Sequence, residues 1–442
     1  MTDKASKNTF KTGKTKNPWS WIPSVYFAEG LPYIVVMTVS VIMYKRLEIS
    51  NTEIAFYTSW LYLPWVIKPF WSPIVELLKS KRWWIVTMQL FIGAGLAGVA
   101  FTLPTSFFFQ GSLAFFWLLA FSSATQDIAI DGFYMMGLKE NQQAFFVGIR
   151  NTFYRIAMVT GQGILVILAG YLENSNLLGN PQNGNNIPMA WAATFIVLAV
   201  LFFLFALYHK FFLPKPSEDI QKVSVDIKNI LNGFGETITA YFYKPDIWTI
   251  IGFLLLFRLG ESQLVKMASP FLLDTKDIGG LALTTSQVGI AYGTIGIIAL
   301  TIGGILGGWM ASGMGLKRLL WVFVFSMNLP NLVYVYLAYA LPSQYWVIVA
   351  SVAVEQFGYG FGFTAYTLYM LYVSRGKYKT AHFAFSTGIM ALGMMLPGMI
   401  SGWLQELLGY QHFFVWVMLC TIPGFIMAKL IKLDKNFGMK TN

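Results

Sequence analysis

Three polar residues within an apolar run are the strongest candidates for chemistry in this chain. The stretch from Ser122 to Asp131 reads SSATQDIAID and lies inside an apolar segment of about residues 107–138. Asp127 and Asp131 are four residues apart, so on a helix both carboxylates lie on one face, one turn apart. A carboxylate in such surroundings is costly unless it faces a polar cavity or a partner charge. The two carboxyl groups can bind and release protons, and the Gln126 amide beside them can form hydrogen bonds.

Ten ionisable side chains, Asp127 and Asp131 included, lie well inside apolar segments. Five of them are acids and five are bases. The acids are Glu29, Asp127, Asp131, Glu261 and Glu355, and the bases are Lys68, Arg150, Arg155, Arg258 and Lys266. Charges in lipid surroundings pair with one another or line a polar pathway. Two interpretations stay open. In the first, the ion pairs are structural and only hold the helices together, with Lys68 and Arg150 as the main examples. In the second, a cavity is lined by acids that carry protons, namely Asp127, Glu29, Asp131 and Glu261.

Positions along the chain predict which of these charges meet. The turn after segment 107–138 centres near residue 140, and Asp131 and Arg150 each lie about nine residues from it, or ~14 Å at 1.5 Å per residue. Such matched depths bring side chains of antiparallel neighbours together. The expected pairs are Asp131 with Arg150, Asp127 with Arg155, Glu29 with Lys68, and, within one helix, Arg258 with Glu261.

The composition indicates which elements position these groups. Of the 442 residues, 56% are hydrophobic and only 12% are charged, whereas a soluble domain carries about 25% charged residues. We therefore predict an all-α integral membrane protein. Apolar runs long enough to cross a ~30 Å hydrocarbon core lie near 19–46, 53–77, 83–103, 107–138, 142–172, 188–210, 245–273, 284–310, 317–340, 345–374, 378–405 and 411–432.

These runs predict twelve transmembrane helices arranged as two six-helix bundles. The expected parts are a cytoplasmic basic tail at 1–18, bundles at 19–210 and 245–432, a cytoplasmic linker at 211–244, and a cytoplasmic tail at 433–442. Within the linker, apolar residues recur at helical spacing from Ile227 to Tyr241, which predicts an amphipathic helix. The spacing of Gly303 and Gly307 favours close helix packing, either at the interface between the bundles or as plain packing of neighbouring helices.

The distribution of basic residues predicts the orientation. With the N-terminus in the cytoplasm, 23 Lys and Arg residues fall in cytoplasmic tails and loops and 3 in loops of the opposite side. The positive-inside rule then places both termini in the cytoplasm. Membrane orientation therefore explains the net charge of +11, and we expect no nucleic-acid partner. The apolar run after Lys16 is too long for a cleavable signal peptide, so we expect the first helix to direct its own insertion.

The rare residue types argue against a metal or a disulfide. The chain has one cysteine, Cys420, and three histidines, His209, His382 and His412, which are not spaced as ligand pairs. We expect no cofactor other than a proton as coupling ion.

Polar stripes on several helices predict a substrate site between the bundles. Tyrosine next to hydrogen-bonding side chains suits a sugar, whose C–H faces pack on rings while its hydroxyls bond. Interface belts of aromatic residues are the alternative explanation. The candidate substrate residues are Tyr26, Tyr33, Gln126, Asn151, Tyr154, Arg155, Gln162, Arg258, Lys266, Glu355 and Tyr359.

Three stretches resemble the AmpG-type branch of the major facilitator superfamily, the muropeptide permeases. They are YFAEGLPY at 26–33, KPFWSPIVE at 68–76, and SATQDIAIDG at 123–132, the last followed by the segment from Arg150 to Arg155. The resemblance covers chiefly the N-terminal half, because the C-terminal half matches in helix pattern more than in residues. Acetyl-CoA transporters resemble the same branch more distantly.

The resemblance implies the major facilitator fold and import of anhydro-muropeptide saccharides across a bacterial inner membrane, driven by protons. It also implies that Asp127 and Asp131 match the family's acidic pair and that Glu29 matches the acid of its first-helix motif. The function we expect is thus a proton-coupled saccharide transporter acting as a monomer. Two alternatives stay open: a proton-independent exchanger or exporter of a drug-like or CoA-like solute, and a membrane-embedded acyltransferase using His382 and Ser386.

The orientation gives a first testable prediction. A cysteine introduced at Asn180, in the loop between the fifth and sixth helices, should react with a membrane-impermeant reagent added outside the cell. Labelling that occurs only from the cytoplasmic side would contradict the orientation.

Overall fold

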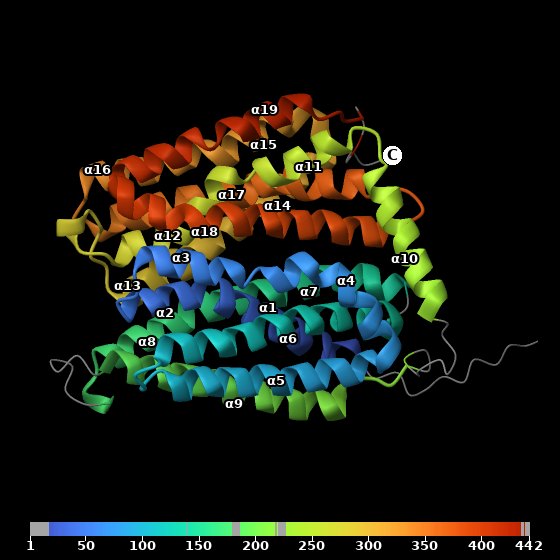
Figure 1. Cartoon of the computed structure of the whole chain (residues 1–442), viewed down its shortest axis with the longest axis horizontal. Helices are drawn as coiled ribbons and strands as arrows, with labels where there is room; N and C mark the ends of the chain where they lie inside the picture. Colours follow the sequence, from blue (N-terminus) through green and yellow to red (C-terminus); the bar gives the residue numbers. More distant parts are fainter. Residues whose placement is uncertain are drawn as a thin grey trace, which may run out of the picture.

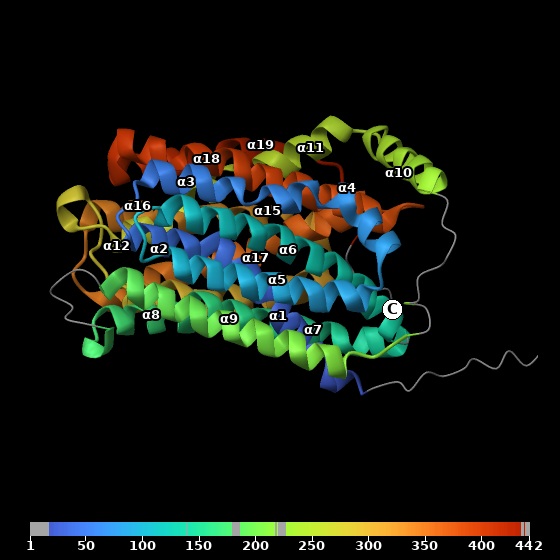
Figure 2. The ribbon, with the colours of Figure 1, turned by 60° about the horizontal axis from the view of Figure 1, so that its bottom comes forward.

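The chain folds into long helices that run side by side. The structure, a computed structural model, describes residues 17–138, 140–178, 186–216, 219, 227–434 and 437. Within these ranges the regular secondary structure is helical. In Figure 1, most of α1 to α9 lies in the lower part of the bundle and most of α11 to α19 in the upper part, whereas in the turned view of Figure 2 the two halves overlap.

In the N-terminal half, some of the membrane crossings are each divided into two consecutive helices. Its α-helices are α1 (Ile22–Ile34), α2 (Ser40–Arg46), α3 (Asn51–Trp60), α4 (Leu63–Leu78), α5 (Lys81–Thr102), α6 (Phe108–Gly137), α7 (Glu140–Val159), α8 (Val166–Glu173) and α9 (Asn186–Phe212). The π-helical turns Val35–Val39 and Thr160–Leu165 join α1 to α2 and α7 to α8.

The C-terminal half is divided in the same way. Its α-helices are α11 (Ile247–Leu256), α12 (Leu259–Leu273), α13 (Thr285–Val288), α14 (Ile297–Met314), α15 (Leu316–Asn328), α16 (Leu332–Ala340), α17 (Tyr345–Val373), α18 (Lys379–Leu419) and α19 (Ile422–Leu430). A π-helical turn at Gly289–Gly296 joins α13 to α14, and a 3₁₀ turn at Leu329–Asn331 joins α15 to α16.

The helix lengths agree with a polytopic membrane protein. Within the described ranges, ten helical segments are long and apolar enough to cross a membrane. The last of these, Lys379–Leu430, turns at Gly409, whose φ of 69° is not helical. Dividing it there, and counting the segment formed by α3 and α4, gives twelve long helical segments in the part of the chain that the structure describes, consistent with the predicted twelve crossings.

The linker contains the helix that its pattern predicts. Helix α10 (Ile227–Phe242) lies across the end of the C-terminal half (Figure 1). The Tyr241 hydroxyl is 2.9 Å from the Ser386 hydroxyl. On the other half, Asp219 accepts a hydrogen bond of 2.7 Å from the backbone N–H of Lys81. The linker is therefore attached to both halves.

The two ends of the bundle can be named by their helices. We call the end that carries α10 the α10 end, and the opposite end, where α13 and α8 lie, the α13 end (Figure 1). The described chain both begins and ends at the α10 end (Figure 1, Figure 2). Asn180 and residues 1–16 lie outside the described residues.

Glycines allow the two halves to approach closely. A Cβ atom on Gly402 of α18 would collide with the carbonyl of Asn51, and one on Gly293 would collide with the carbonyl of Gln162. Backbones that meet without side chains between them pack tightly in membranes. Of the two alternatives for Gly303 and Gly307, the structure shows plain helix packing, because these glycines pack against α17, near Phe357 and Phe361, inside the C-terminal half.

This contact predicts the effect of enlarging one glycine. Gly402→Leu should lower the thermal stability of the purified protein in detergent, since overpacking costs about 1–3 kcal/mol. Gly308→Leu is the matched control, because nothing lies within 4 Å of a Cβ atom at that position. Equal unfolding temperatures for the two variants would contradict close contact at Gly402.

Candidate functional site

Five ionisable side chains of the N-terminal half meet in one cluster. Lys68 of α4 forms an ion pair with Asp127 of α6, and the two side chains are 24% and 23% exposed. The Glu29 carboxyl of α1 lies beside the Asp127 carboxyl, close enough for the two groups to share a proton. Asp131, one turn along α6, lies 3.5 Å from Arg150 of α7. We call these residues the N-half charge cluster, with Glu29, Lys68, Asp127, Asp131 and Arg150 as members.

Three of the four predicted ion pairs were wrong, two of them in the N-terminal half. Lys68 contacts Asp127 instead of Glu29, and the Arg155 guanidinium contacts the Met158 sulfur at 3.6 Å instead of Asp127. The pair of Asp131 with Arg150 is confirmed. Equal distances from the turn between α6 and α7 therefore predicted the ion pair that lies nearest to that turn.

Gln126 has a structural task at this cluster. Pro32 lacks an N–H, so within α1 the carbonyl of Ala28, four residues earlier, loses its helical donor. The Gln126 side-chain N–H donates to that carbonyl at 3.2 Å. This bond ties α6 to α1 directly beside Glu29 and Asp127. Pro32 and Gln126 together thus fix the distance between the two carboxyl groups.

Aromatic rings hold Arg150 in position. Its guanidinium carbon lies 5.2 Å from the ring centres of both Tyr26 and Tyr134, a cation–π arrangement. It also donates to the Tyr26 hydroxyl at 3.3 Å. Since Tyr26 is only 2% exposed, its observed contacts are with Arg150 and not with an open cavity.

The C-terminal half contains a second group of buried charges. Helix α11 ends at Leu256 and α12 begins at Leu259, so the helical spacing that would pair Arg258 with Glu261 is interrupted. Arg258 instead donates to the Tyr359 hydroxyl. Its guanidinium also lies 5.0 Å from the ring centre of Phe363. The expected ion pair of Arg258 with Glu261 is therefore not formed.

The buried acids of this half are incompletely hydrogen-bonded. Glu261 and Glu355 are each 1% exposed, and among the described residues neither oxygen of Glu261 has a hydrogen-bond partner. One oxygen of Glu355 accepts from the Gln356 side chain at 3.0 Å. Tyr334, in α16, has a buried hydroxyl that is likewise without a partner in the described chain. Unsatisfied buried polar groups of this kind mark sites that ligands or water complete.

Side chains from both halves meet between them. Tyr62, at the break between α3 and α4, lies beside Tyr33. The Tyr33 ring contacts the Trp65 ring edge to face, with centres 5.3 Å apart. From the C-terminal half, Lys266 lies 5.3 Å from the ring centre of Tyr62 and donates to the Thr58 hydroxyl at 2.9 Å. Sequence reasoning missed Tyr62 and Trp65; the helix-breaking YLPW motif around them was the available signal.

The remaining candidate residues fall in different surroundings. Tyr154 packs its ring against the backbone of Gly30 and is partly buried. Gln162 is 3% exposed at the contact between the halves. Asn151 is exposed, so it does not share the buried surroundings of Gln162. The structure thus brings Tyr33, Arg155, Lys266, Arg258 and Tyr359 toward the interface and leaves Asn151 at the surface.

The halves are closed against each other at the α13 end by polar contacts. Lys45 of α2 lies 2.6 Å from Asp274, which follows α12. The Tyr410 hydroxyl donates to the other Asp274 oxygen at 2.6 Å. The Asn51 amide donates to Gln405 of α18 at 2.5 Å. These contacts join both halves in one hydrogen-bonded layer.

Glu173 makes a second closure at the same end. It forms an ion pair with Arg46 at 3.1 Å and accepts from the Trp191 indole N–H at 2.9 Å. Across the interface it accepts from the Thr285 hydroxyl at 2.7 Å. With the α13 end closed, the 48% exposure of the Asp131 side chain indicates access to the N-half charge cluster from the α10 end.

The described residues contain no group of three or more His, Cys, Asp or Glu side chains placed to bind a metal ion. The side chains that the structure brings together here can exchange protons, form ion pairs and hydrogen bonds, and stack rings.

The cluster gives a prediction about coupling. Lys68→Met alone should destabilise the protein more than Lys68→Met combined with Asp127→Asn, because the single change leaves a carboxylate without its partner. We expect a coupling free energy of about 1–3 kcal/mol in unfolding experiments in detergent. Asp131 and Arg150 are the matched control pair; being more exposed, they should couple by less than about 1 kcal/mol. Additive effects at Lys68 and Asp127 would refute their direct interaction.

Comparison with known proteins places the chain in a family. The Major Facilitator Superfamily model matches residues 24–402. The anhydromuropeptide permease of Escherichia coli (strain K12) is 22% identical over 407 residues, covering 91% of this chain and 77% of that protein. A Rickettsia conorii protein assigned the name AmpG 4 is 24% identical over 425 residues, covering 92% and 94%.

Solved structures support the same fold. A D-xylose-proton symporter superposes with a TM-score of 0.70 at 10% identity, covering 95% of this chain and 98% of that chain. The nucleoside transporter NupG gives 0.66 at 15% identity, covering 93% and 98%. The family and the named relatives are transporters, so the acyltransferase alternative is excluded. With a family match over most of its length, the chain is a multi-pass membrane transporter that belongs to the Major Facilitator Superfamily.

Proposed function

We propose that this transporter imports an amino-sugar saccharide of the anhydro-muropeptide kind together with protons, by alternating access. The observation that carries the proposal is the contact between the carboxyl groups of Glu29 and Asp127 beside the Lys68 ammonium. The name of the Escherichia coli relative supplies the substrate class.

The carboxyl contact supports proton binding because of its chemistry. An ionised carboxylate only accepts hydrogen bonds, so a hydrogen bond between two carboxyl groups requires one proton. Lys68 balances the one negative charge that remains on the pair. When the proton leaves, two carboxylates face one ammonium, and like charges disfavour that state. Loss of the proton therefore favours separation of Glu29 from Asp127. Protonation is in this way linked to a conformational change.

The centre of the molecule suits a sugar that carries an acidic group. The rings of Tyr33, Tyr62 and Trp65 offer faces and edges for the apolar side of a sugar ring. Arg155 has no carboxylate within ion-pairing distance in the described chain, so its guanidinium is free to bind a substrate carboxylate. Arg258 and Tyr359 face the same region from the C-terminal half and are hydrogen-bonded to each other.

The distribution of basic residues supports an assignment of the two ends. We propose that the α10 end is cytoplasmic, both termini included, in a bacterial inner membrane. The contacts at Asp274 and Glu173 then close the outer side. We propose on this basis that the conformation faces inward, the state in which an importer releases its substrate and its proton. We expect the transporter to act as a monomer.

The proposal predicts separate effects on accumulation and exchange. In proteoliposomes with an imposed pH gradient, Asp127→Asn and Glu29→Gln should each abolish accumulation of anhydro-muropeptide against its gradient. Exchange with preloaded substrate should remain at a measurable fraction of the wild-type rate, because exchange needs no net proton transfer. Radiolabelled uptake with and without the gradient measures both activities.

The control variant is Asp434→Asn, which removes an exposed acid that pairs with Arg375 at the surface and should leave both activities unchanged. If Asp127→Asn and Glu29→Gln still accumulate substrate, the proton is carried elsewhere. If the wild type exchanges solute but never accumulates it under a pH gradient, the alternative of a proton-independent exchanger is favoured.

A further inference from the structure

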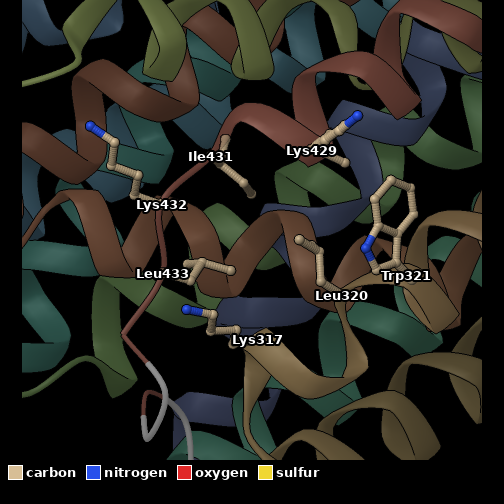
Figure 3. Close-up of a pocket in the computed structure, with 8 residues that line it drawn as sticks. Lys317, Leu320, Trp321, Lys429, Ile431, Lys432 and Leu433 are labelled. Carbon is tan, nitrogen blue, oxygen red and sulfur yellow. The ribbon is translucent and has the colours of Figure 1, made fainter.

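A hollow on the outer surface of the C-terminal half is separate from the transport site. It lies where α15 begins and α19 ends, and its volume is about 350 Å³. Figure 3 shows its side chains around the opening, with Trp321 and Lys429 on one side and Lys432 on the other. The lining residues are Lys317, Leu320, Trp321, Ala428, Lys429, Ile431, Lys432 and Leu433.

The hollow sits at the boundary of the apolar surface. Along α15, Trp321 and Phe325 are 43% and 46% exposed, and along α19, Ile422 and Ile426 are 51% and 55% exposed. Large apolar side chains left exposed on a membrane transporter face lipid. The lysines begin where these two stripes end, at the start of α15 and the end of α19. This is the depth of the lipid headgroups.

The charge of the hollow is positive and only partly compensated. Within the described residues, Lys317 and Lys429 form no ion pair, whereas Lys432 lies 3.0 Å from Asp246. The Lys432 side chain is 80% exposed, so its ammonium still reaches the opening. Beneath the lysines, Leu320 and Leu433 are 6% and 7% exposed and form an apolar floor.

The shape of the hollow is fixed by the end of the chain. The N–H of Leu316 donates to the Phe437 carbonyl at 2.9 Å. The Arg375 guanidinium lies 4.3 Å from the Phe437 ring centre. These contacts bring residues 431–434 back across the start of α15. The positive-inside rule explains why lysines are present at this depth, but it does not require lysines of two chain segments to line one hollow.

We propose that this hollow binds the phosphate headgroup of an anionic phospholipid. The phosphate faces Lys317 and Lys429, as basic pockets at the cytoplasmic boundary of membrane proteins bind acidic headgroups. The acyl chains follow the exposed apolar stripes of α15 and α19. The Trp321 ring lies at the level where tryptophan anchors membrane proteins. The proposal does not depend on the identity of the transported substrate.

Native mass spectrometry of the full-length protein tests the proposal. The wild-type protein, in detergent with added cardiolipin, phosphatidylglycerol or phosphatidylcholine, should retain the two anionic lipids and release phosphatidylcholine. The variant with both Lys317→Ala and Lys429→Ala should bind cardiolipin roughly 30-fold more weakly, since a lysine near anionic lipid contributes ~1 kcal/mol.

The matched control carries Lys79→Ala and Lys379→Ala, two exposed lysines outside the hollow, and should retain cardiolipin like the wild type. Cardiolipin retention that is equal in all three proteins would overturn the proposal, as would equal retention of phosphatidylcholine by the wild type. Displacement of cardiolipin by millimolar inorganic phosphate would also overturn it, because the site would then recognise a free anion. Unchanged unfolding temperatures of the variants in lipid-free detergent would show that any loss of lipid is local.

Discussion

The cost of a carboxylate inside a membrane protein is the constraint on which the N-terminal half depends. Asp127 is tolerated there because Lys68 pairs with it and because Glu29 lies beside it, close enough to share a proton. Each of these partners comes from a different helix, so α1, α4 and α6 can pack only in an arrangement that brings the three groups together. The freed carbonyl of Ala28, which accepts from Gln126, fixes that arrangement further. The polar cluster thus determines helix packing as much as it provides chemistry.

The predictability of the site follows from the same physics. Apolar runs predicted the helices, since the length and hydropathy of a membrane-crossing segment depend on local sequence alone. The pair of Asp131 with Arg150 was predictable because α6 and α7 are joined by a short turn, which sets their relative depth. The partner of Asp127 was not, because α4 and α6 are distant in sequence. The predicted pair of Arg258 with Glu261 was wrong because a break separates α11 from α12, and the spacing of the two residues could not indicate this break.

The contacts that close the α13 end differ in kind from the apolar packing of the helices. One apolar core continues across both halves and a smaller core lies within each half, whereas the α13 end is closed by side-chain hydrogen bonds and the Lys45–Asp274 ion pair. Polar groups of this kind can exchange their partners for water when the α13 end opens. Glycine surfaces at Gly293 and Gly402 let the backbones meet closely. This combination suits two rigid bodies that rock about a central site.

The central claim is that the pair of Glu29 and Asp127 holds one exchangeable proton. The most direct measurement is the number of protons exchanged when substrate binds, obtained by calorimetry in buffers of different ionisation enthalpy. The account predicts that the apparent binding enthalpy of anhydro-muropeptide depends on the buffer in the wild type and is independent of the buffer in Glu29→Gln. A wild-type binding enthalpy that is the same in every buffer across the pH range of transport would contradict the account.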